Sequence, residues 1–446
     1  SHLSQRITRR LLPLFILVEL LLGVVGGVSV LLLYWAYALG SLYYGALYGC
    51  LILIGGLTGL ELPLLTRLLK RYGSLRATIA RALSFDYVGA LAGSVLFPLL
   101  LLPWLGMART AFVVGLLNVG VGLWNAAAFR ERLRAPGALL GVGSAAAAGL
   151  AVGLAFSTRL VSMAEANLYE DEVVYAAQTP YQRIVITRWK EDLRLFLDGN
   201  LQFSSTDEYR YHEALVHPAV ALAPRAERAL VLGGGDGLAV RELLKHQRLR
   251  EIVLVDIDPR MTALGRGYPG IVALNQGALR DPRVRLVHQD AHRFLVAGAD
   301  LYDVIVADLP DPNSDVLAKL YTVEFYRLAR RRLSAEGVLT TQASSPFFSR
   351  DAFWCVVETL REAGFETAPY HAYVPSFGDW GFVLAATRRL VPAAIRIAVP
   401  TRFLTDGVVR QMFAFGRDTG PVPVDPSTMD HPVILSYYLQ NSRQWE

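Results

Sequence analysis

Five long apolar stretches fill the first 160 residues of this 446-residue chain, at roughly 12–33, 43–66, 87–105, 109–128 and 137–157. A helix needs about 20 apolar residues to cross the hydrocarbon core of a bilayer, and each stretch is near that length. The first stretch has no small-residue cleavage site, so it does not resemble a signal peptide. The sequence therefore predicts a transmembrane helical bundle of about five spans over residues 1–160, with the lipid bilayer as its partner.

Glycines and acidic residues interrupt these apolar stretches. The glycines recur in groups, namely Gly23/Gly26/Gly27, Gly55/Gly56/Gly59 and Gly89/Gly93. Small residues allow transmembrane helices to approach closely, so we interpret these groups as packing positions. Glu19, Glu61 and Asp86 lie in or beside the stretches, where an ionisable group is costly and is a functional candidate. Span ends and interhelical hydrogen bonds explain Glu61 and Asp86 equally well.

The charges divide between the two halves of the chain. Residues 1–160 hold 13 Lys/Arg and 4 Asp/Glu, a net charge of +9, whereas residues 161–446 hold 31 and 35, a net charge of −4. A basic excess confined to the apolar half is typical of a membrane protein and does not indicate a nucleic-acid partner. The only cysteines, Cys50 and Cys355, are far apart in the sequence and predict neither a disulfide nor a zinc site.

The basic residues near the apolar stretches also predict a topology. Three clusters precede the first stretch, follow the second and follow the fourth, namely Arg6/Arg9/Arg10, Arg67/Lys70/Arg71/Arg76/Arg81 and Arg130/Arg132/Arg134. The positive-inside rule places these clusters in the cytoplasm, and five crossings then put everything after residue 160 outside. The chain begins with Ser-His and no Met, so we expect a trimmed sequence from which earlier spans can be missing.

The pattern changes to that of a soluble α/β protein after residue 160. Short β-type runs over 173–185 and 193–197, broken at Thr179-Pro180 and Asp198-Gly199, predict a small antiparallel sheet within residues 161–227. From residue 228, strand-like runs at 229–232, 252–255, 284–287, 304–307, 338–341 and 382–386 alternate with helical patterns such as 238–245, 316–333 and 351–363. This alternation predicts a parallel sheet in a Rossmann-like, methyltransferase-type domain over 228–390. We find no chemistry in the extension over 391–446.

A glycine-rich turn follows the first strand of the predicted parallel sheet. Gly233 to Gly237 read GGGDG, and glycines permit a tight turn and a close approach of the backbone to a ligand. The spacing differs from G-x-G-x-x-G, which disfavours a dinucleotide. Asp256 ends the second strand about 20 residues later, where a carboxylate can accept both ribose hydroxyls, and Asp258 can share that task. These features predict an adenosine-type site.

Carboxylates gather at the same edge of the predicted sheet. They follow successive strands and comprise Asp236, Asp256, Asp290, Asp308 and Asp311. Like charges at close range repel one another, and a cationic ligand relieves that repulsion. No His/Cys cluster accompanies them, so the sequence predicts an organic cation as ligand and no metal.

At these residues the chain resembles the spermidine synthase family, the polyamine aminopropyltransferases. The resemblance covers roughly 173–386 and rests on Tyr181-Gln182, the L-D-G-x-x-Q run from Leu197 to Gln202, Asp207-Glu208-Tyr209, Tyr211-His212-Glu213, GGGDG, Asp256, Asp290-Ala291 and the D-x-x-D-P run from Asp308. The apolar half resembles the membrane-spanning branch of that family, including the stretch that begins at Asp86. The family moves an aminopropyl group from decarboxylated S-adenosylmethionine, a co-substrate, to putrescine, yielding spermidine and 5′-methylthioadenosine without a prosthetic group.

The resemblance also implies roles for individual residues. The nucleoside would contact Gln182, Gly233, Gly235, Asp256, Asp290 and Ala291. The amine would contact Tyr211, His212, Asp236 and Asp311, and Asp308 would be the catalytic proton acceptor. The chemistry agrees, because a sulfonium is a good leaving group whereas freeing the lone pair of an ammonium with a pKa of about 10.4 costs roughly 4–5 kcal/mol at pH 7. His212 is the second candidate for the base, with a hydrogen-bonding or structural role favoured for it.

Three departures from the family pattern concern the amine side of the site. Leu309-Pro310 replaces two small hydroxyl residues, Asn313 follows Pro312 where the family has a proline, and Phe377 replaces a tyrosine. These departures leave the acceptor open as putrescine or a related amine, and they support nucleoside binding better than putrescine as the acceptor. Two other functions also stay open, an S-adenosylmethionine-dependent amine N-methyltransferase and a non-catalytic polyamine sensor or transporter. The family resemblance also implies a homo-oligomer.

The resemblance and the charge pattern disagree about location. The family's donor is made inside the cell, so we expect a multi-pass protein of the cell membrane whose catalytic half is cytoplasmic, against the five-span topology. A sixth crossing or half-span within residues 34–66 would reconcile the two.

Overall fold

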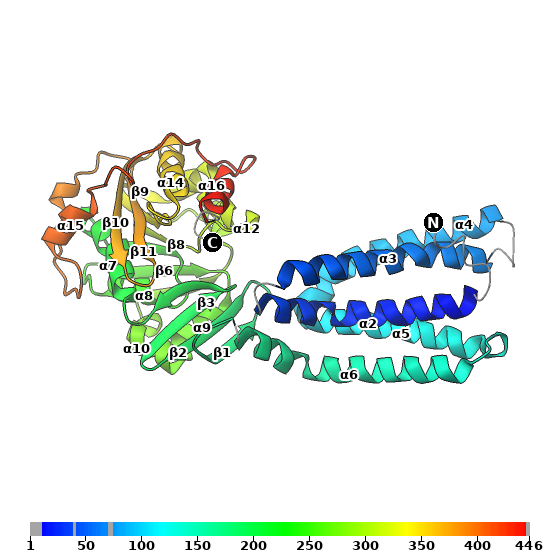
Figure 1. The fold of residues 1–446 in the computed structure, drawn as a ribbon. Helices are drawn as coiled ribbons and strands as arrows, with labels where there is room; N and C mark the ends of the chain where they lie inside the picture. The colour runs from blue at the N-terminus through cyan, green and yellow to red at the C-terminus, as the bar shows by residue number, and fades with distance from the viewer. Residues whose placement is uncertain (1–10, 39–41, 70–74, 167, 443–446) are drawn as a thin grey trace. The chain divides into compact units, whose positions relative to one another are not determined.

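The computed structural model of the protein describes residues 11–38, 42–69, 75–166 and 168–442, and the chain divides into two compact units, 1–180 and 181–446 (Figure 1). The basic residues Arg6, Arg9, Arg10, Lys70 and Arg71 of the topology prediction lie outside the described residues. The finer division of the chain into segments 1–160, 161–227, 228–390 and 391–446 stays a prediction.

The first unit is built from long helices. They are α2 (Leu11–Ala38), α3 (Tyr43–Leu69), α4 (Leu75–Leu96), the π-helical turn η1 (Phe97–Leu101), α5 (Leu102–Ala128), the short η2 (Arg130–Arg132) and α6 (Pro136–Ala166). Within the described residues, four segments are long and apolar enough to cross a membrane, Leu11–Ala38, Tyr43–Leu68, Leu83–Ala128 and Pro136–Val161. The third has 46 residues and is broken at Gly106 (φ 73°, ψ 174°), so the predicted stretches 87–105 and 109–128 lie on either side of this break. Residues 43–66 belong to one continuous helix, which gives no support to an additional crossing there.

Close glycine contacts join α2 to α5 in this unit. A Cβ atom added to Gly23 would lie 2.7 Å from the carbonyl oxygen of Gly115, and one added to Gly115 would lie 2.8 Å from the Cα of Gly27. The predicted packing role therefore holds for Gly23 and Gly27. It stays a prediction for Gly26 and for the groups Gly55/Gly56/Gly59 and Gly89/Gly93, where an added Cβ would meet none of the described residues within 4 Å. Glu19 is buried, 4% exposed, and its side chain hydrogen-bonds that of Glu61.

Strand β1 (Glu172–Gln178) lies at the end of the first unit, and a small antiparallel sheet opens the second. Its strands are β2 (Arg183–Trp189), β3 (Asp192–Leu197) and β4 (Asn200–Ser204), and β3 pairs antiparallel with both β2 and β4. The predicted break at Asp198-Gly199 is the β3–β4 turn, where both residues have positive φ (48° and 82°). Helix α7 (Glu208–Leu222) then leads into the main sheet.

The main sheet has seven strands in the order β10-β11-β9-β8-β5-β6-β7. The strands are β5 (Arg228–Gly233), β6 (Glu251–Asp256), β7 (Val284–His288), β8 (Tyr302–Asp308), β9 (Leu333–Gln342), β10 (Glu366–Val374) and β11 (Gly378–Ala386). Strands β5 to β9 are parallel, as predicted. The prediction was wrong for the strand at 382–386, because β11 runs antiparallel to β9 after a tight hairpin with β10, which we had not predicted.

Helices cover both faces of this sheet. They are α8 (Leu238–Leu244), α9 (Pro259–Gly267), α10 (Pro269–Asn275), η3 (Ala278–Arg280), α11 (Ala291–Ala297), α12 (Asp315–Ala318), η4 (Lys319–Tyr321), α13 (Val323–Arg331), α14 (Arg350–Glu362), η5 (Pro392–Ala394), α15 (Asp406–Met412) and α16 (Val433–Ser442). Because side chains alternate along a strand, Ala229 and Val231 enter one core with α7, α8 and α15, whereas Leu230 and Leu232 enter the other with α11, α13, α14 and α16.

The helix predicted over 316–333 is interrupted in the structure. Thr322 ends η4 and caps α13, since its Oγ1 accepts a hydrogen bond from the Phe325 backbone N–H at 3.3 Å. A threonine whose side chain caps the next helix favours the end of the helix before it. The apolar periodicity contains no signal for this cap, so it predicted one continuous helix.

Candidate active site

The glycine-rich turn lies where β5 meets the ends of its two neighbours. Gly233 pairs with Asp308 at the end of β8, and a Cβ atom at Gly233 would collide with the Asp308 backbone carbonyl. A Cβ atom at Gly235 would collide with the Asp256 carboxylate at the end of β6. The turn therefore needs glycine, with positive φ at Gly233 (79°), because the Asp308 carbonyl and the Asp256 carboxylate occupy the space that side chains would take.

On the β6 side of the turn, Asp256 and Asp258 form a linked acidic pair. Asp256 Oδ1 accepts a hydrogen bond from the Asp258 N–H at 2.7 Å, and Asp258 caps α9 and accepts a hydrogen bond from Gln182 Nε2 at 3.1 Å. Burial, together with the charges of Asp258 and Asp236, raises the pKa of Asp256 to about 6. The structure thus brings Gln182 to the same edge as Asp256, where it donates to the neighbouring Asp258.

Asp290 and Ala291 follow the next strand, β7. Asp290 caps α11 by accepting a hydrogen bond from the Arg293 N–H at 2.8 Å, and Ala291 is the first residue of that helix. These two residues therefore stand at the carboxyl edge of the sheet, in the strand order β5, β6, β7 that the prediction requires.

On the β8 side of the turn, Asp308 meets Tyr211 and His212 of α7. The Tyr211 hydroxyl donates to Asp308 Oδ1 at 2.9 Å, and His212 Nε2 lies 3.9 Å from Asp308 Oδ2. Burial raises the pKa of Asp308, while the charge of His212 and the hydrogen bond from Tyr211 oppose that rise. Burial likewise raises the pKa of Asp236 to about 6, with His212 lowering it and Asp308 raising it.

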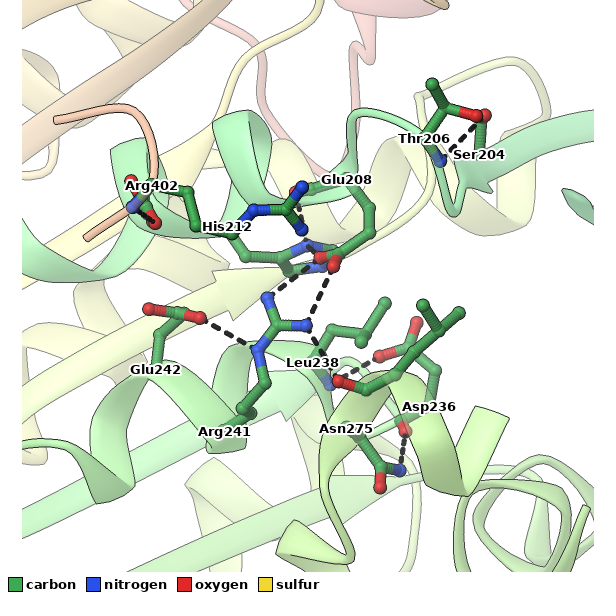
Figure 2. Close-up of polar contacts among 12 residues, drawn as sticks. Ser204, Thr206, Glu208, His212, Asp236, Leu238, Arg241, Glu242, Asn275 and Arg402 are labelled. Carbon is green, nitrogen blue, oxygen red and sulfur yellow. Dashed lines mark hydrogen bonds and ion pairs between the residues drawn. The ribbon is translucent and has the colours of Figure 1, made fainter. Parts of the chain in front are cut away.

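A buried ion-pair chain controls the charge of His212 (Figure 2). His212 Nδ1 lies 2.9 Å from Glu208 Oε2, Arg241 donates to both Glu208 oxygens at 2.7 and 2.9 Å, and Arg241 Nε donates to Glu242 at 2.8 Å. Burial lowers the pKa of His212, but its hydrogen bond with Glu208 and the charge of that carboxylate outweigh burial and raise the pKa to about 9. His212 is therefore an imidazolium at neutral pH and already holds the proton that a base would have to accept, which favours Asp308 in that role.

Asp311 is held by three neutral donors. Gln342 Nε2 donates to its Oδ1 at 3.2 Å, while the hydroxyls of Ser344 and Tyr438 donate to its Oδ2 at 3.4 and 3.1 Å. Burial raises the pKa of Asp311 to about 6 against these hydrogen bonds. Ser344 has a positive φ of 63°, and strained backbone of this kind clusters at functional sites.

The structure shows what surrounds two of the three departures from the family pattern, Leu309-Pro310 and Phe377. Leu309 is buried, 7% exposed, in one of the two cores of the sheet, and the Tyr321 hydroxyl donates to the carbonyl oxygens of Leu309 and Pro310 at 3.2 and 2.9 Å. The Tyr321 phenol thus provides a hydrogen-bond donor for the backbone carbonyls at the two positions where the family has hydroxyl residues. Phe377 packs edge-on against Tyr211, with ring centroids 6.1 Å apart, and 5.0 Å from the ring of Trp380.

Sequence reasoning missed four contributors to the site. Gln342 ends β9, and a polar residue at the end of a predicted strand was an available signal. Glu208 belongs to the Asp207-Glu208-Tyr209 motif, to which the sequence assigned no role, and Arg241 lies on α8, just after the glycine turn. Tyr438 gave no signal, because α16 lies in the extension that we had found without chemistry. Within the described residues, no group of three or more His, Cys, Asp or Glu side chains is arranged to hold a metal.

Known proteins share both the sequence and the fold of this chain. Residues 208–393 match the Spermine/spermidine synthase domain family. The chain is 47% identical over 440 residues to polyamine aminopropyltransferase 2 of Ralstonia nicotianae, covering 97% of this chain and 86% of that protein. It is 41% identical over 447 residues to polyamine aminopropyltransferase of Leptospira interrogans, covering 100% and 89%.

Among solved structures, a spermidine synthase in complex with the transition-state analogue AdoDATO matches with a TM-score of 0.51 at 26% identity, covering 55% of this chain and 86% of that one. This match confirms the Rossmann-like, methyltransferase-type fold that the sequence predicts for the second half. The matches to the Ralstonia and Leptospira proteins extend over nearly the whole chain. The chain therefore belongs to the spermine/spermidine synthase family, the polyamine aminopropyltransferases.

Proposed function

We propose that this protein transfers the aminopropyl group of decarboxylated S-adenosylmethionine to putrescine, releasing spermidine and 5′-methylthioadenosine. The observation that carries the proposal is the position of Asp308. It lies at the end of β8 next to the glycine turn, with Asp256 on one side of that turn and Asp311 further along its own loop. An acid in this position faces both a nucleoside bound along β6 and an amine bound along the Asp311 loop.

The reaction is a displacement at carbon. The amine lone pair forms a bond to the propyl carbon next to the sulfonium, and the carbon–sulfur bond breaks with its electron pair moving to sulfur. The sulfonium thereby becomes the neutral thioether of methylthioadenosine, and no general acid is required for the leaving group. The lone pair becomes available when the ammonium form of the amine gives one proton to Asp308, whose carboxylate must be ionised beforehand.

The surrounding groups prepare the carboxylates for that task. The imidazolium of His212 lowers the pKa of both Asp308 and Asp236 against the effect of burial, so both can be anionic when the amine arrives. Asp236 and Asp311, each with a pKa raised to about 6, are ionised at neutral pH and attract the two ammonium groups of a diamine. A diamine held at both ends places one nitrogen at a fixed distance from the reacting carbon.

Two observations weigh against the other functions. An N-methyltransferase must hold the carboxylate of its donor, and the anionic edge formed by Asp236, Asp256 and Asp308 repels one. A sensor or transporter needs no proton acceptor beside the bound amine, whereas Asp308 is buried with the hydroxyl of Tyr211 and an imidazolium against it.

The proposal is tested with the purified full chain in detergent. Incubation with decarboxylated S-adenosylmethionine and putrescine should yield spermidine and methylthioadenosine in equal amounts, measured by chromatography. S-adenosylmethionine should yield no methylated amine. Methylated putrescine without spermidine would establish the methyltransferase instead, and tight amine binding without turnover would establish the sensor.

The setting of the enzyme forms a second part of the proposal. We place the first unit in the cell membrane as a multi-pass anchor, supported by the four long apolar segments, and the catalytic half in the cytoplasm, where the family's donor is made. We also propose a homo-oligomer on the basis of the family resemblance. A reporter active only outside the cytoplasm, fused after Glu446, should be inactive, and light scattering in detergent should give more than one chain per particle.

A further inference from the structure

We propose that Tyr438, on the C-terminal helix α16, is a positioning residue that determines how tightly the enzyme binds a diamine. The inference rests on the proposed function and deepens it. Tyr438 is separated from Asp311 by 127 positions in the sequence, and its hydroxyl donates to Asp311 Oδ2 at 3.1 Å. Residue 438 also lies beyond residues 208–393, the part of the chain that matches the family domain.

The donor set around Asp311 defines what Tyr438 does. A carboxylate offers about four acceptor positions, two on each oxygen. Ser344 and Tyr438 fill both positions of Oδ2, whereas Gln342 fills one position of Oδ1. Counting the partners given by the described residues, one position on Oδ1 is left for an ammonium group. The hydrogen bond from Tyr438 fixes the rotation of the Asp311 carboxylate, so that the remaining acceptor position on Oδ1 points in one direction.

The segment that carries Tyr438 is firmly attached to the catalytic unit. Ile434 of α16 is fully buried in the core that also contains α13 and α14. Upstream, the Ser427 N–H donates to Thr359 Oγ1 at 2.9 Å and the Ser427 carbonyl accepts from the Val323 N–H at 2.9 Å. These contacts anchor the segment to both α13 and α14, so α16 presents the phenol from a rigid support.

The chemistry of the site explains why a phenol suits this position. Burial and the charge of Asp311 hold the pKa of Tyr438 far above its ordinary value, so the hydroxyl keeps its proton and can donate it to Asp311. A neutral donor orients Asp311 without cancelling the negative charge that attracts an ammonium group. A lysine or arginine at the same place would neutralise that charge.

The test compares Y438F with Y437F in the full chain. Tyr437 is the adjacent residue on α16, and its hydroxyl accepts a hydrogen bond from the Asp425 N–H at 3.3 Å, so Y437F also removes one phenol hydroxyl but leaves Asp311 untouched. The measurements are the KM for putrescine, the KM for decarboxylated S-adenosylmethionine, and the inhibition constant of butylamine, which has the same four-carbon chain but one amine.

We expect Y438F to raise the KM for putrescine about tenfold, since a hydrogen bond to a charged group is lost. The KM for the donor and the inhibition constant of butylamine should stay within about twofold of wild type, because butylamine has no second ammonium for Asp311 to hold. Y437F should resemble wild type in all three measurements. An unchanged KM for putrescine, an equal loss for butylamine, or the same loss in Y437F would each overturn the inference.

The outcome separates this inference from the proposed function. If wild-type protein makes no spermidine, the proposed function is wrong, and calorimetric titration of putrescine into protein saturated with methylthioadenosine then tests Tyr438 directly. Weaker binding by about tenfold in Y438F but not in Y437F supports the role in diamine binding, whereas equal affinity in all three proteins rejects it.

Discussion

The buried chain His212–Glu208–Arg241 should make E208Q strongly destabilising. Glu208 is 1% exposed and carries two hydrogen bonds from Arg241 in addition to its contact with His212. Removing one partner of a buried ion pair costs about 3–5 kcal/mol. We expect about 3 kcal/mol, at the lower end, because Glu242 still accepts from Arg241 Nε in the variant.

The matched control is E251Q. Glu251 pairs with Arg228 at 2.8 Å, but both side chains are 35% exposed, and exposed pairs contribute about 0–1 kcal/mol. Thermal unfolding of the full chain in detergent, followed by a signal from the catalytic unit, should show a Tm about 6–12 °C lower for E208Q. E251Q should change the Tm by no more than about 4 °C. Equal shifts in the two variants would refute the assignment of this ion pair as a major source of stability.

The same ion pair predicts a pH dependence. The pKa of His212 is raised from 6.5 to about 9, so its stabilising contribution is fully present below pH 6.5 and is lost as the pH rises through about 9. A shift of this size corresponds to about 3 kcal/mol. The Tm of the wild type should therefore fall between pH 6.5 and 9 by more than the Tm of E208Q. Parallel curves for the two proteins would show that Glu208 does not hold the charge of His212.

Three further predictions concern the site itself. D308N should lower kcat about 10²–10⁴-fold with a much smaller change in the KM for putrescine, measured by methylthioadenosine release, and a variant with near-normal turnover would remove Asp308 as proton acceptor. G235A should weaken binding of methylthioadenosine at least tenfold, because its Cβ would collide with the Asp256 carboxylate, and unaltered affinity in calorimetry would contradict that collision. The pKa values of Asp236 and Asp311 are both raised to about 6, so these groups stabilise the folded state below pH 3.8, and that contribution is lost as the pH rises through about 6. Because the two carboxylates are ionised at pH 8 and largely protonated at pH 5, putrescine should raise the Tm more at pH 8 than at pH 5. A larger rise at pH 5 would exclude these carboxylates as the amine site.

The order of elements in the catalytic half was predictable because local sequence patterns specify it. Buried parallel strands appear as short apolar runs, and the glycine turn and the strand-end carboxylates follow them directly. The parallel sheet topology then brings Asp256, Asp290 and Asp308 to one edge without further information. The hairpin of β10 and β11 escaped prediction because β10 contains polar and aromatic residues that periodicity alone does not assign to an edge strand.

The sequence by itself thus determined the apolar helical half, the α/β half, the glycine turn and the acidic strand ends, because each depends on residues close together in the chain. Only the tertiary structure decided that His212 is positively charged, since that depends on Glu208 and on Arg241 from another helix. It alone brought Tyr438 to Asp311 across 127 positions. The physical reason is that charge state and donor geometry in a buried site depend on neighbours in space, and burial makes those neighbours count far more than water would.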